Sequence, residues 1–325
     1  QWLGILYEYK KLYAPAIKHY MLGLQGTPKR YIGVAANLGH LLISLGRPKE
    51  AIALLQPRVA LDSKVTFAHL ILGRAYLATS QFDRARQRFE RIQQVDPQSR
   101  EAKLGIALSL RSAGEFKQAK KVIDALLTEH PDYLAAMLEE GVIQLGLGEN
   151  EAARSAFDKA LELGASQSQI AHMQAKYYTG RRDFITARDI YVDIIRNGLA
   201  SPYSYTQLSE LYLSAREVEK GEDALLQGLS KHPDNPYLHF RHGSYLAATK
   251  KYQESLAPFA KATELAPYAA NILSSYTIAL SKAGETERAI EVAKKLYENS
   301  AKSPSAALLY ALQLEKSPLH QQLAI

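Results

Sequence analysis

Apolar residues recur along most of the chain at helical spacing, in segments of about a dozen residues that come in pairs. Residues 105–131, for example, read GIALSLRSAGEFKQAKKVIDALLTEHP, with apolar positions three and four residues apart on both sides of a short polar break. That spacing is typical of amphipathic helices. The break often holds a glycine (Gly46, Gly114, Gly148, Gly284), as a left-handed cap at the end of a helix requires. The pattern predicts two helices joined by a tight turn.

The same pattern returns every thirty-four residues, and small residues keep the register. Twelve residues after each of the first eight small positions stands a second small residue, four further on stands an apolar one, and a proline closes most copies. The first set, here called the anchors, is Gly39, Gly73, Ala107, Gly141, Ala175, Ser209, Gly243, Thr277 and Ala311. The second set is Ala51, Ala85, Ala119, Ala153, Ala187, Gly221, Ser255 and Ala289, and the apolar set is Leu55, Phe89, Ile123, Phe157, Tyr191, Leu225, Phe259 and Ala293. The prolines are Pro97, Pro131, Pro202, Pro233, Pro267 and Pro304, of which Pro202 and Pro304 are shifted by three.

A helix of about 14 residues is marginal alone in water, so its stability has to come from packing one face against neighbours. We expect the small residues to let the two helix backbones of a unit approach, and the large residue to fill the space between units. Proline lacks an N–H and disfavours helix in the residue before it, so each closing proline is expected to end the second helix. Since each hairpin buries its apolar face only against adjacent hairpins, the chain is predicted to be a one-dimensional array.

This register resembles the tetratricopeptide repeat family, whose helix-turn-helix unit has thirty-four residues. The resemblance implies an all-α, right-handed α-solenoid with the first helices lining a concave groove. We assign residues 1–31 to a partial N-terminal repeat, 32–303 to eight consecutive repeats, and 304–325 to the start of a further repeat or a C-terminal helix. Gly4, Ala16 and Tyr20 fit the same template after a one-residue insertion before Gly39.

The amino-acid composition excludes several kinds of functional site. The chain has 325 residues, 47% of them hydrophobic and 22% charged, with a formal net charge of +7 that is spread along its length. It has no cysteine, which removes disulfides, Cys-ligated zinc and thiol nucleophiles. No apolar run approaches the roughly 18 residues that a membrane span needs. The compartment cannot be read from these features, and neither can the oligomeric state.

The sequence has few motifs that indicate catalysis, metal binding or nucleic-acid binding. The sequence has no phosphate-binding G-x-x-x-x-G-K-[ST], no G-x-S-x-G and no H-E-x-x-H motif. His239 and His242 lie three apart and share a helical face, but no third metal ligand stands nearby, so we interpret them as partly exposed histidines. Arg84, Arg86, Arg88 and Arg91 form a basic run that acidic residues interrupt, which favours a solvated outer face over a nucleic-acid stripe. We therefore expect no catalytic residues, no metal and no cofactor.

The family resemblance indicates where a partner would bind, because ligand contacts in that family come mainly from inward-facing positions of the first helices. Counted from the anchors, these positions give a mostly apolar set in the first half of the chain and a polar set with aromatics in the second half. Thirteen of the 20 tyrosines lie after residue 162. The predicted groove residues are Phe67, Leu70, Arg74, Leu77, Leu104, Leu108, Leu138, Val142, His172, Lys176, Tyr203, Tyr237 and Phe240.

Exposed apolar residues mark contact surfaces, and aromatic residues beside polar groups are typical of binding hot spots. The sequence hence predicts a non-catalytic scaffold that binds a partner protein or peptide in its groove. Two alternatives stay open. The repeats can be an arm of a larger protein, such as a bacterial exopolysaccharide export component with an outer-membrane barrel or an enzyme with an accessory domain. Nucleic-acid binding is the less favoured alternative, and it predicts steeply salt-dependent affinity.

Overall fold

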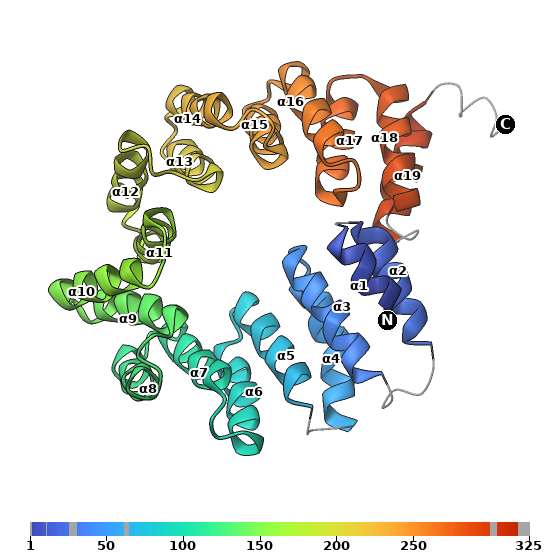
Figure 1. Cartoon of the computed structure of the whole chain (residues 1–325). Coiled ribbons are helices and arrows are strands. Elements are labelled where there is room, and N and C mark those ends of the chain that lie inside the picture. Colours follow the sequence, from blue (N-terminus) through green and yellow to red (C-terminus); the bar gives the residue numbers. More distant parts are fainter. Residues whose placement is uncertain (1, 11, 26–30, 62–64, 300–303, 318–325) are drawn as a thin grey trace. The chain divides into compact units, whose positions relative to one another are not determined.

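Helices make up nearly all of the part of the chain that the structure describes. The computed structural model describes residues 2–10, 12–25, 31–61, 65–299 and 304–317, and within these ranges it contains nineteen helices and no strand (Figure 1). Their bounds are α1 Trp2–Tyr9, α2 Tyr13–Gly23, α3 Ile32–Ser44, α4 Pro48–Leu61, α5 Thr66–Ala78, α6 Phe82–Val95, α7 Arg100–Ser112, α8 Phe116–Glu129, α9 Leu134–Leu147, α10 Asn150–Glu162, α11 Gln167–Gly180, α12 Phe184–Arg196, α13 Pro202–Ser214, α14 Val218–Lys231, α15 Pro236–Ala248, α16 Tyr252–Leu265, α17 Ala270–Lys282, α18 Thr286–Asn299 and α19 Pro304–Lys316.

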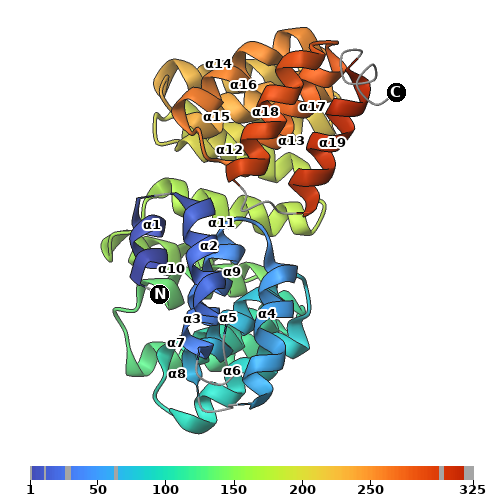
Figure 2. The same cartoon turned by 90° about the vertical axis from the view of Figure 1, so that its right-hand side faces the viewer.

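The helices form two compact units. Unit 1 runs to Ile170 and unit 2 starts at Ala171, except that Leu12–Pro15 group with unit 2. Inside each unit consecutive helices pack as antiparallel pairs, and each pair packs against the next (Figure 2). The odd-numbered first helices lie on the inner side of each unit's arc, and the even-numbered second helices lie on its outer side (Figure 1). The all-α repeat fold expected from the sequence is confirmed.

The anchor residues leave room for one particular side chain, which stands sixteen residues later in the same hairpin. A Cβ atom built on Gly73 would lie 2.7 Å from Cζ of Phe89, and one on Gly141 would lie 2.4 Å from Cε1 of Phe157. Phe89 is 1% exposed and Phe157 is 3% exposed. Contacts under 3.0 Å are too close for carbon atoms, so the glycine is what lets the ring enter between the two helices.

In the other hairpins the anchor also faces the residue sixteen positions later, but the sizes of the two side chains differ. A Cβ atom on Gly39 would lie 2.8 Å from Cδ1 of Leu55, and one on Gly243 would lie 2.9 Å from Cδ1 of Phe259. Thr277 is the largest anchor, and the residue sixteen later is Ala293; both are fully buried. Ala311, the last anchor, is exposed on α19. The small positions twelve residues after the anchors are buried in all eight hairpins from α3–α4 to α17–α18.

Every turn between the two helices of a hairpin from α3–α4 to α17–α18 has the same backbone conformation. One residue per turn has a positive φ between 58° and 85°, and these residues recur every thirty-four positions. Four are glycines, as predicted, while the other four are Ser80, Arg182, Arg216 and Lys250. In each turn the following residue donates its N–H to a helix carbonyl five residues earlier, for example Arg47 N to Leu42 O at 2.8 Å and Lys251 N to Leu246 O at 2.8 Å. This bond is the hallmark of the Schellman cap and stabilises the left-handed residue.

The links between hairpins are of two kinds, which corrects one prediction. Pro97, Pro131, Pro233 and Pro267 directly follow the residue that caps a second helix, as expected. Pro202 and Pro304 instead open the next first helix, where a missing N–H costs nothing because the first N–H groups have no helical partner. At the ends of α10 and α12 the left-handed glycines Gly164 and Gly198 close the helix in place of a proline.

Buried apolar side chains of unit 1 form one large cluster that reaches from α3 to α9. Unit 2 instead divides its core among smaller clusters, each shared by adjacent hairpins. This arrangement is what a stack of hairpins produces, because each helix pair can bury its apolar face only against its neighbours.

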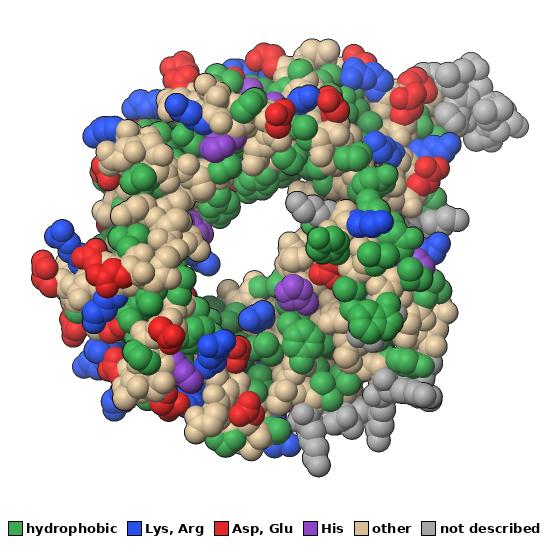
Figure 3. Space-filling view, in the orientation of Figure 1, with side chains coloured by type: hydrophobic (Ala, Val, Ile, Leu, Met, Phe, Trp, Pro, Cys, Tyr) green, Lys and Arg blue, Asp and Glu red, His purple; other side chains and the backbone are tan. Residues whose placement is uncertain are grey.

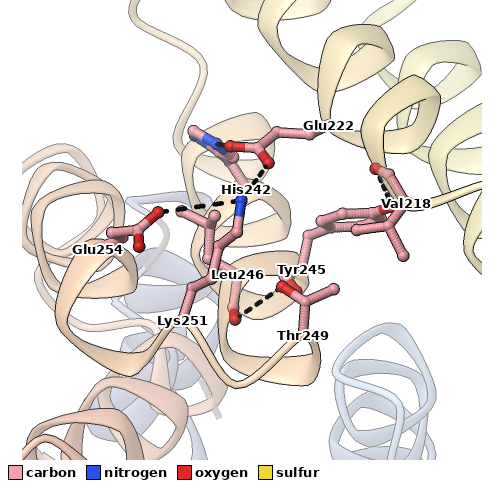
Figure 4. A network of polar contacts seen from close by, with 8 residues as sticks. All are labelled: Val218, Glu222, His242, Tyr245, Leu246, Thr249, Lys251 and Glu254. Atoms are coloured by element: carbon pink, nitrogen blue, oxygen red, sulfur yellow. Dashed lines mark hydrogen bonds and ion pairs between the residues drawn. The ribbon is translucent and has the colours of Figure 1, made fainter.

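A polar network joins α14 to α15 inside unit 2 (Figure 4). The hydroxyl of Tyr245 donates to the carbonyl of Val218 at 2.7 Å, and Gly221 lets that ring approach, since a Cβ there would lie 2.2 Å from the tyrosine oxygen. The ammonium of Lys251 lies 3.0 Å from a carboxylate oxygen of Glu222. These contacts tie the start of α14 to the α15–α16 hairpin.

Candidate partner-binding surface

The predicted groove residues of unit 1 differ in exposure. Phe67 on α5 is 44% exposed, and Arg74 on the same helix is also exposed. Three leucines are half-buried and pack against the core of unit 1, namely Leu70, Leu77 and Leu104. Leu108 on α7 is half-buried as well. The accessible apolar surface at these positions is therefore small.

Leu138 and Val142 do not belong to an accessible surface. They are 9% and 3% exposed on α9, which packs against α7, α8 and α10. Counting positions from the anchor cannot detect this, because it ignores how far each helix is rotated toward its neighbours. We remove these two residues from the candidate surface.

The predicted residues of unit 2 come together. The ring centroids of His172 and Tyr203 are 4.6 Å apart in an edge-to-face arrangement, and those of Tyr203 and Tyr237 are 6.4 Å apart with planes inclined by 13°. Phe240 continues the series at 6.3 Å from Tyr237. With Lys176, which lies one helical turn after His172, these five residues form what we call the aromatic surface. Figure 3 shows hydrophobic side chains gathered along the inner edge of unit 2, where the first helices lie.

The two tyrosines are held by the starts of their helices. Tyr203 and Tyr237 each follow a proline that opens the helix, Pro202 in α13 and Pro236 in α15. The side chain of Asn235 caps α15 by accepting a hydrogen bond from the N–H of Leu238 at 3.0 Å. Proline and a capped first turn reduce backbone freedom, so the rings are positioned before any partner arrives.

The rings are accessible, although they are anchored. Tyr203 is 39% exposed and Tyr237 is 37% exposed. Beneath them Phe240 contacts the buried Phe259, whose ring centroid is 6.2 Å away and which in turn stacks on Tyr276. An aromatic series thus leads from the open surface into the core of unit 2.

Burial raises the pKa of both tyrosines, so their phenol groups stay neutral and keep a proton to donate. Burial also lowers the pKa of the His172 imidazole, with a further contribution from the charge of Lys176. The Nδ1 atom of that histidine lies 2.9 Å from the hydroxyl oxygen of Tyr191. At neutral pH the phenol and imidazole rings themselves are consequently uncharged.

Two cations differ in how their charge is compensated, Arg241 beside Tyr237 and Lys176 beside His172. The guanidinium of Arg241 is 6.0 Å from the centroid of the Tyr237 ring and forms an ion pair with Glu210, so its charge is compensated. Lys176 is exposed, and within the described part of unit 2 no carboxylate pairs with it. The fixed charge that the aromatic surface offers to a partner is positive.

Sequence reasoning missed four residues that extend this surface. One is Arg241, two residues before an anchor. The others are exposed aliphatic side chains on α17 and α19, Ile278 at 48%, Leu308 at 62% and Leu312 at 44%. Ile278 and Leu312 occupy the repeat position of Lys176, and Leu308 occupies that of Phe240. Extending the same count past the seventh hairpin would have found these three.

The histidine pair on α15 has separate partners. Nε2 of His239 lies 2.7 Å from the carbonyl oxygen of Pro233. Nε2 of the half-buried His242 lies 3.7 Å from a carboxylate oxygen of Glu222, which is too long for a hydrogen bond. No group of three or more histidine, aspartate or glutamate side chains suited to a metal ion occurs among the residues that the structure describes.

The basic run on α6 interacts locally. The guanidinium of Arg86 lies 3.5 Å from Asp83, 3.7 Å from Glu90 and 3.7 Å from Glu115. These carboxylates compensate the central charge of the run on the outer side of unit 1. For the described ranges, no helix combines the length and the apolar character that crossing a membrane would take.

Antiparallel helix pairs that repeat every thirty-four residues, each with a small residue facing a large one, define an all-α helical-repeat protein. Family models described as tetratricopeptide repeat match residues 42–108, 104–168 and 206–270. Together with the repeat geometry these matches place the chain in the tetratricopeptide repeat family.

One solved structure agrees with this assignment at the level of the fold, and two further proteins are similar over part of their length. A tetratricopeptide repeat protein from Parabacteroides merdae has a TM-score of 0.53 at 19% identity, with 65% of this chain and 82% of that one covered. The crystal structure of MamA is 25% identical over half of this chain and 94% of its own, with a TM-score of 0.44. The "Protein CTR9 homolog" of Arabidopsis thaliana is 22% identical over 272 residues, which is 79% of this chain. The chain spans a quarter of the length of that relative.

Proposed function

We propose that the protein is a scaffold that binds a partner protein or peptide on the inner face of its first helices, and that binding involves no chemical step. The observation that supports this most is the aromatic surface, where Tyr203 and Tyr237 stand nearly parallel on neighbouring first helices and stay more than one third exposed. Aromatic side chains supply large contact areas at little entropic cost, and they dominate binding hot spots.

Unit 1 contributes a smaller part of the proposed surface. Phe67 and Arg74 are exposed there, and Leu70, Leu77, Leu104 and Leu108 are partly accessible beside them. We expect the aromatic surface of unit 2 to dominate affinity, because its rings are positioned by capped helix starts and their hydroxyls can donate hydrogen bonds.

The test is selection from a displayed random-peptide library on the wild-type chain, followed by binding of the selected peptides to variants. A Tyr203→Ala, Tyr237→Ala double variant should lose at least about tenfold in affinity, since hot-spot truncation typically costs about 2 kcal/mol or more. Tyr268→Ala is the matched control, because Tyr268 is 44% exposed in the link between α16 and α17. Selected peptides that bind both variants equally would show that the inner face of unit 2 is not the binding site.

A further inference from the structure

The chemistry of the aromatic surface restricts the kind of segment that fits it. Its rings are neutral, Arg241 is compensated by Glu210, and the exposed ammonium of Lys176 is left with no carboxylate among the described residues. Lys176 is close enough to His172 to lower the pKa of that imidazole, and His172 contacts the Tyr203 ring. An apolar contact and an uncompensated positive charge therefore lie next to each other.

The separation of the tyrosine rings matches an extended chain. A strand advances about 3.2–3.4 Å per residue and alternates its side chains, so residues two apart on one face are about 6.6 Å apart. The centroids of Tyr203 and Tyr237 are 6.4 Å apart. Side chains at alternate positions of an extended segment can thus each pack against one ring.

The curvature of unit 2 favours an extended occupant over a helical one. A helix also repeats its face at about 6.0 Å, four residues on, so ring spacing alone does not separate the two. The inner helices α13, α15 and α17 follow an arc, however (Figure 1). A straight helix can touch such an arc over a short distance only, whereas an extended segment can bend to follow it.

We propose that the occupant is an extended segment of a partner protein in which every second residue faces the surface, with two successive apolar side chains on Tyr203 and Tyr237 and an acidic side chain at the next alternate position on Lys176. This inference rests on the function proposed above and specifies the partner at the same site. The exposed Ile278, Leu308 and Leu312 provide further apolar contacts along the same repeat positions for a longer segment.

The test compares short fluorescein-labelled peptides with leucine at two alternate positions and glutamate, serine or lysine at the alternate positions on either side of that pair, measured by fluorescence anisotropy on the full chain. The glutamate peptide should bind tightest and the lysine peptide weakest. Lys176→Glu should weaken the glutamate peptide about fivefold and strengthen the lysine peptide, as expected for one partly exposed ion pair. The double tyrosine variant should weaken all three peptides.

Two variants serve as controls. Lys294→Glu changes an exposed lysine on the second helix α18, and Tyr268→Ala removes an exposed ring outside the surface. Both should leave all affinities unchanged. Helical circular dichroism and the thermal midpoint of each variant establish that a loss of binding is not a loss of folding.

Three results would overturn the inference, and they are distinguishable. Equal binding of all three peptides that still depends on the tyrosines would remove the acidic requirement but leave the proposed function intact. Failure of every peptide to bind would refute the extended acidic segment as the occupant. The proposed scaffold function is tested separately, by the displayed-library selection. Tighter binding of a labelled oligouridine than of any peptide, with a steep salt dependence, would assign the rings to stacking on nucleic-acid bases.

Discussion

Small anchors and the large side chains sixteen residues later form complementary pairs, and the pairing changes from hairpin to hairpin. Gly141 accommodates Phe157, Ala107 stands with Ile123, and Thr277 stands with Ala293. In these three pairs the larger anchor stands with the smaller partner, whereas Ala175 stands with the large Tyr191. For Gly141 and Phe157 we expect the pair rather than the single residue to be under constraint.

Gly141→Ala should destabilise unit 1 by about 1–2 kcal/mol. The new methyl group would meet the Phe157 ring at 2.4 Å, and overpacking typically costs about 1–3 kcal/mol, of which a better helix propensity recovers at most about 1. Chemical denaturation followed by circular dichroism measures the change. Gly33→Ala in α3 is the control and should be neutral or stabilising, since a Cβ there meets nothing within 4 Å.

A second change tests the pairing itself. Combining Gly141→Ala with Phe157→Ile recreates the Ala107 and Ile123 pair of the neighbouring hairpin. We expect the double variant to be more stable than the sum of the two single effects predicts, by at least about 0.5 kcal/mol. Strict additivity would mean that the two residues do not share one packing constraint.

Titration of two half-buried histidines should make unit 2 sensitive to acid. Burial lowers the pKa of His242 more strongly than the nearby Glu222 raises it, and burial also lowers the pKa of His172. Below the ordinary histidine value of about 6.5 the unfolded chain binds more protons than the folded chain, so the free energy of unfolding falls as pH falls from there through the folded pKa values. Above about pH 7 this contribution is fully present and flat.

Amide hydrogen exchange of α15, recorded between about pH 7 and pH 5 and corrected for intrinsic exchange rates, checks this expectation. His242→Gln should flatten the dependence, while His130→Gln in the α8–α9 link is the comparison. Protection in α15 that rises as the pH is lowered would contradict the expected loss of stability in acid.

Each helix hairpin from α3–α4 to α17–α18 has one left-handed residue at its turn. In half of the turns this residue is a glycine, which the sequence shows directly. Glycine marks the turns at Gly46, Gly114, Gly148 and Gly284, and those four were predictable. Ser80, Arg182, Arg216 and Lys250 adopt the same conformation without any local sequence signal. Repeat spacing alone identifies them, because each lies thirty-four residues from the next turn.

Lys250→Gly should stabilise unit 2 by about 0.5–1 kcal/mol. A left-handed conformation costs an L-residue roughly 1–2 kcal/mol, which glycine avoids at the expense of a more flexible unfolded chain. Gly148→Ala makes the reverse change at the equivalent turn of unit 1 and should destabilise by about 1 kcal/mol. Thermal unfolding of the two variants must shift in opposite directions if the left-handed residue limits the stability of these turns.

Across the chain, the repeat register predicted the helix pairs, their turns and the buried small residues, since these follow from local spacing. It located the aromatic surface too, through His172, Lys176, Tyr203, Tyr237 and Phe240. It did not foresee that Leu138 and Val142 are buried, because helix rotation depends on neighbouring hairpins. Nor did it foresee that Glu210 compensates Arg241, since that ion pair joins two different hairpins.

Partner binding should slow local opening on the inner side of unit 2 only. The first helices carry the aromatic surface, and the second helices α12, α14 and α16 lie on the outer side of the arc (Figure 1). A partner on the inner face slows local opening of the helices that it contacts, and stabilisation in an array decays with distance from the contact.

The most direct measurement is hydrogen–deuterium exchange of the full chain with and without a peptide selected on the wild type. We predict slower exchange in α11, α13 and α15, centred on the turns that carry His172, Tyr203 and Tyr237, with little change in α12, α14 and α16. Protection confined to those outer helices, or to helices of unit 1 alone, would contradict binding on the inner face of unit 2.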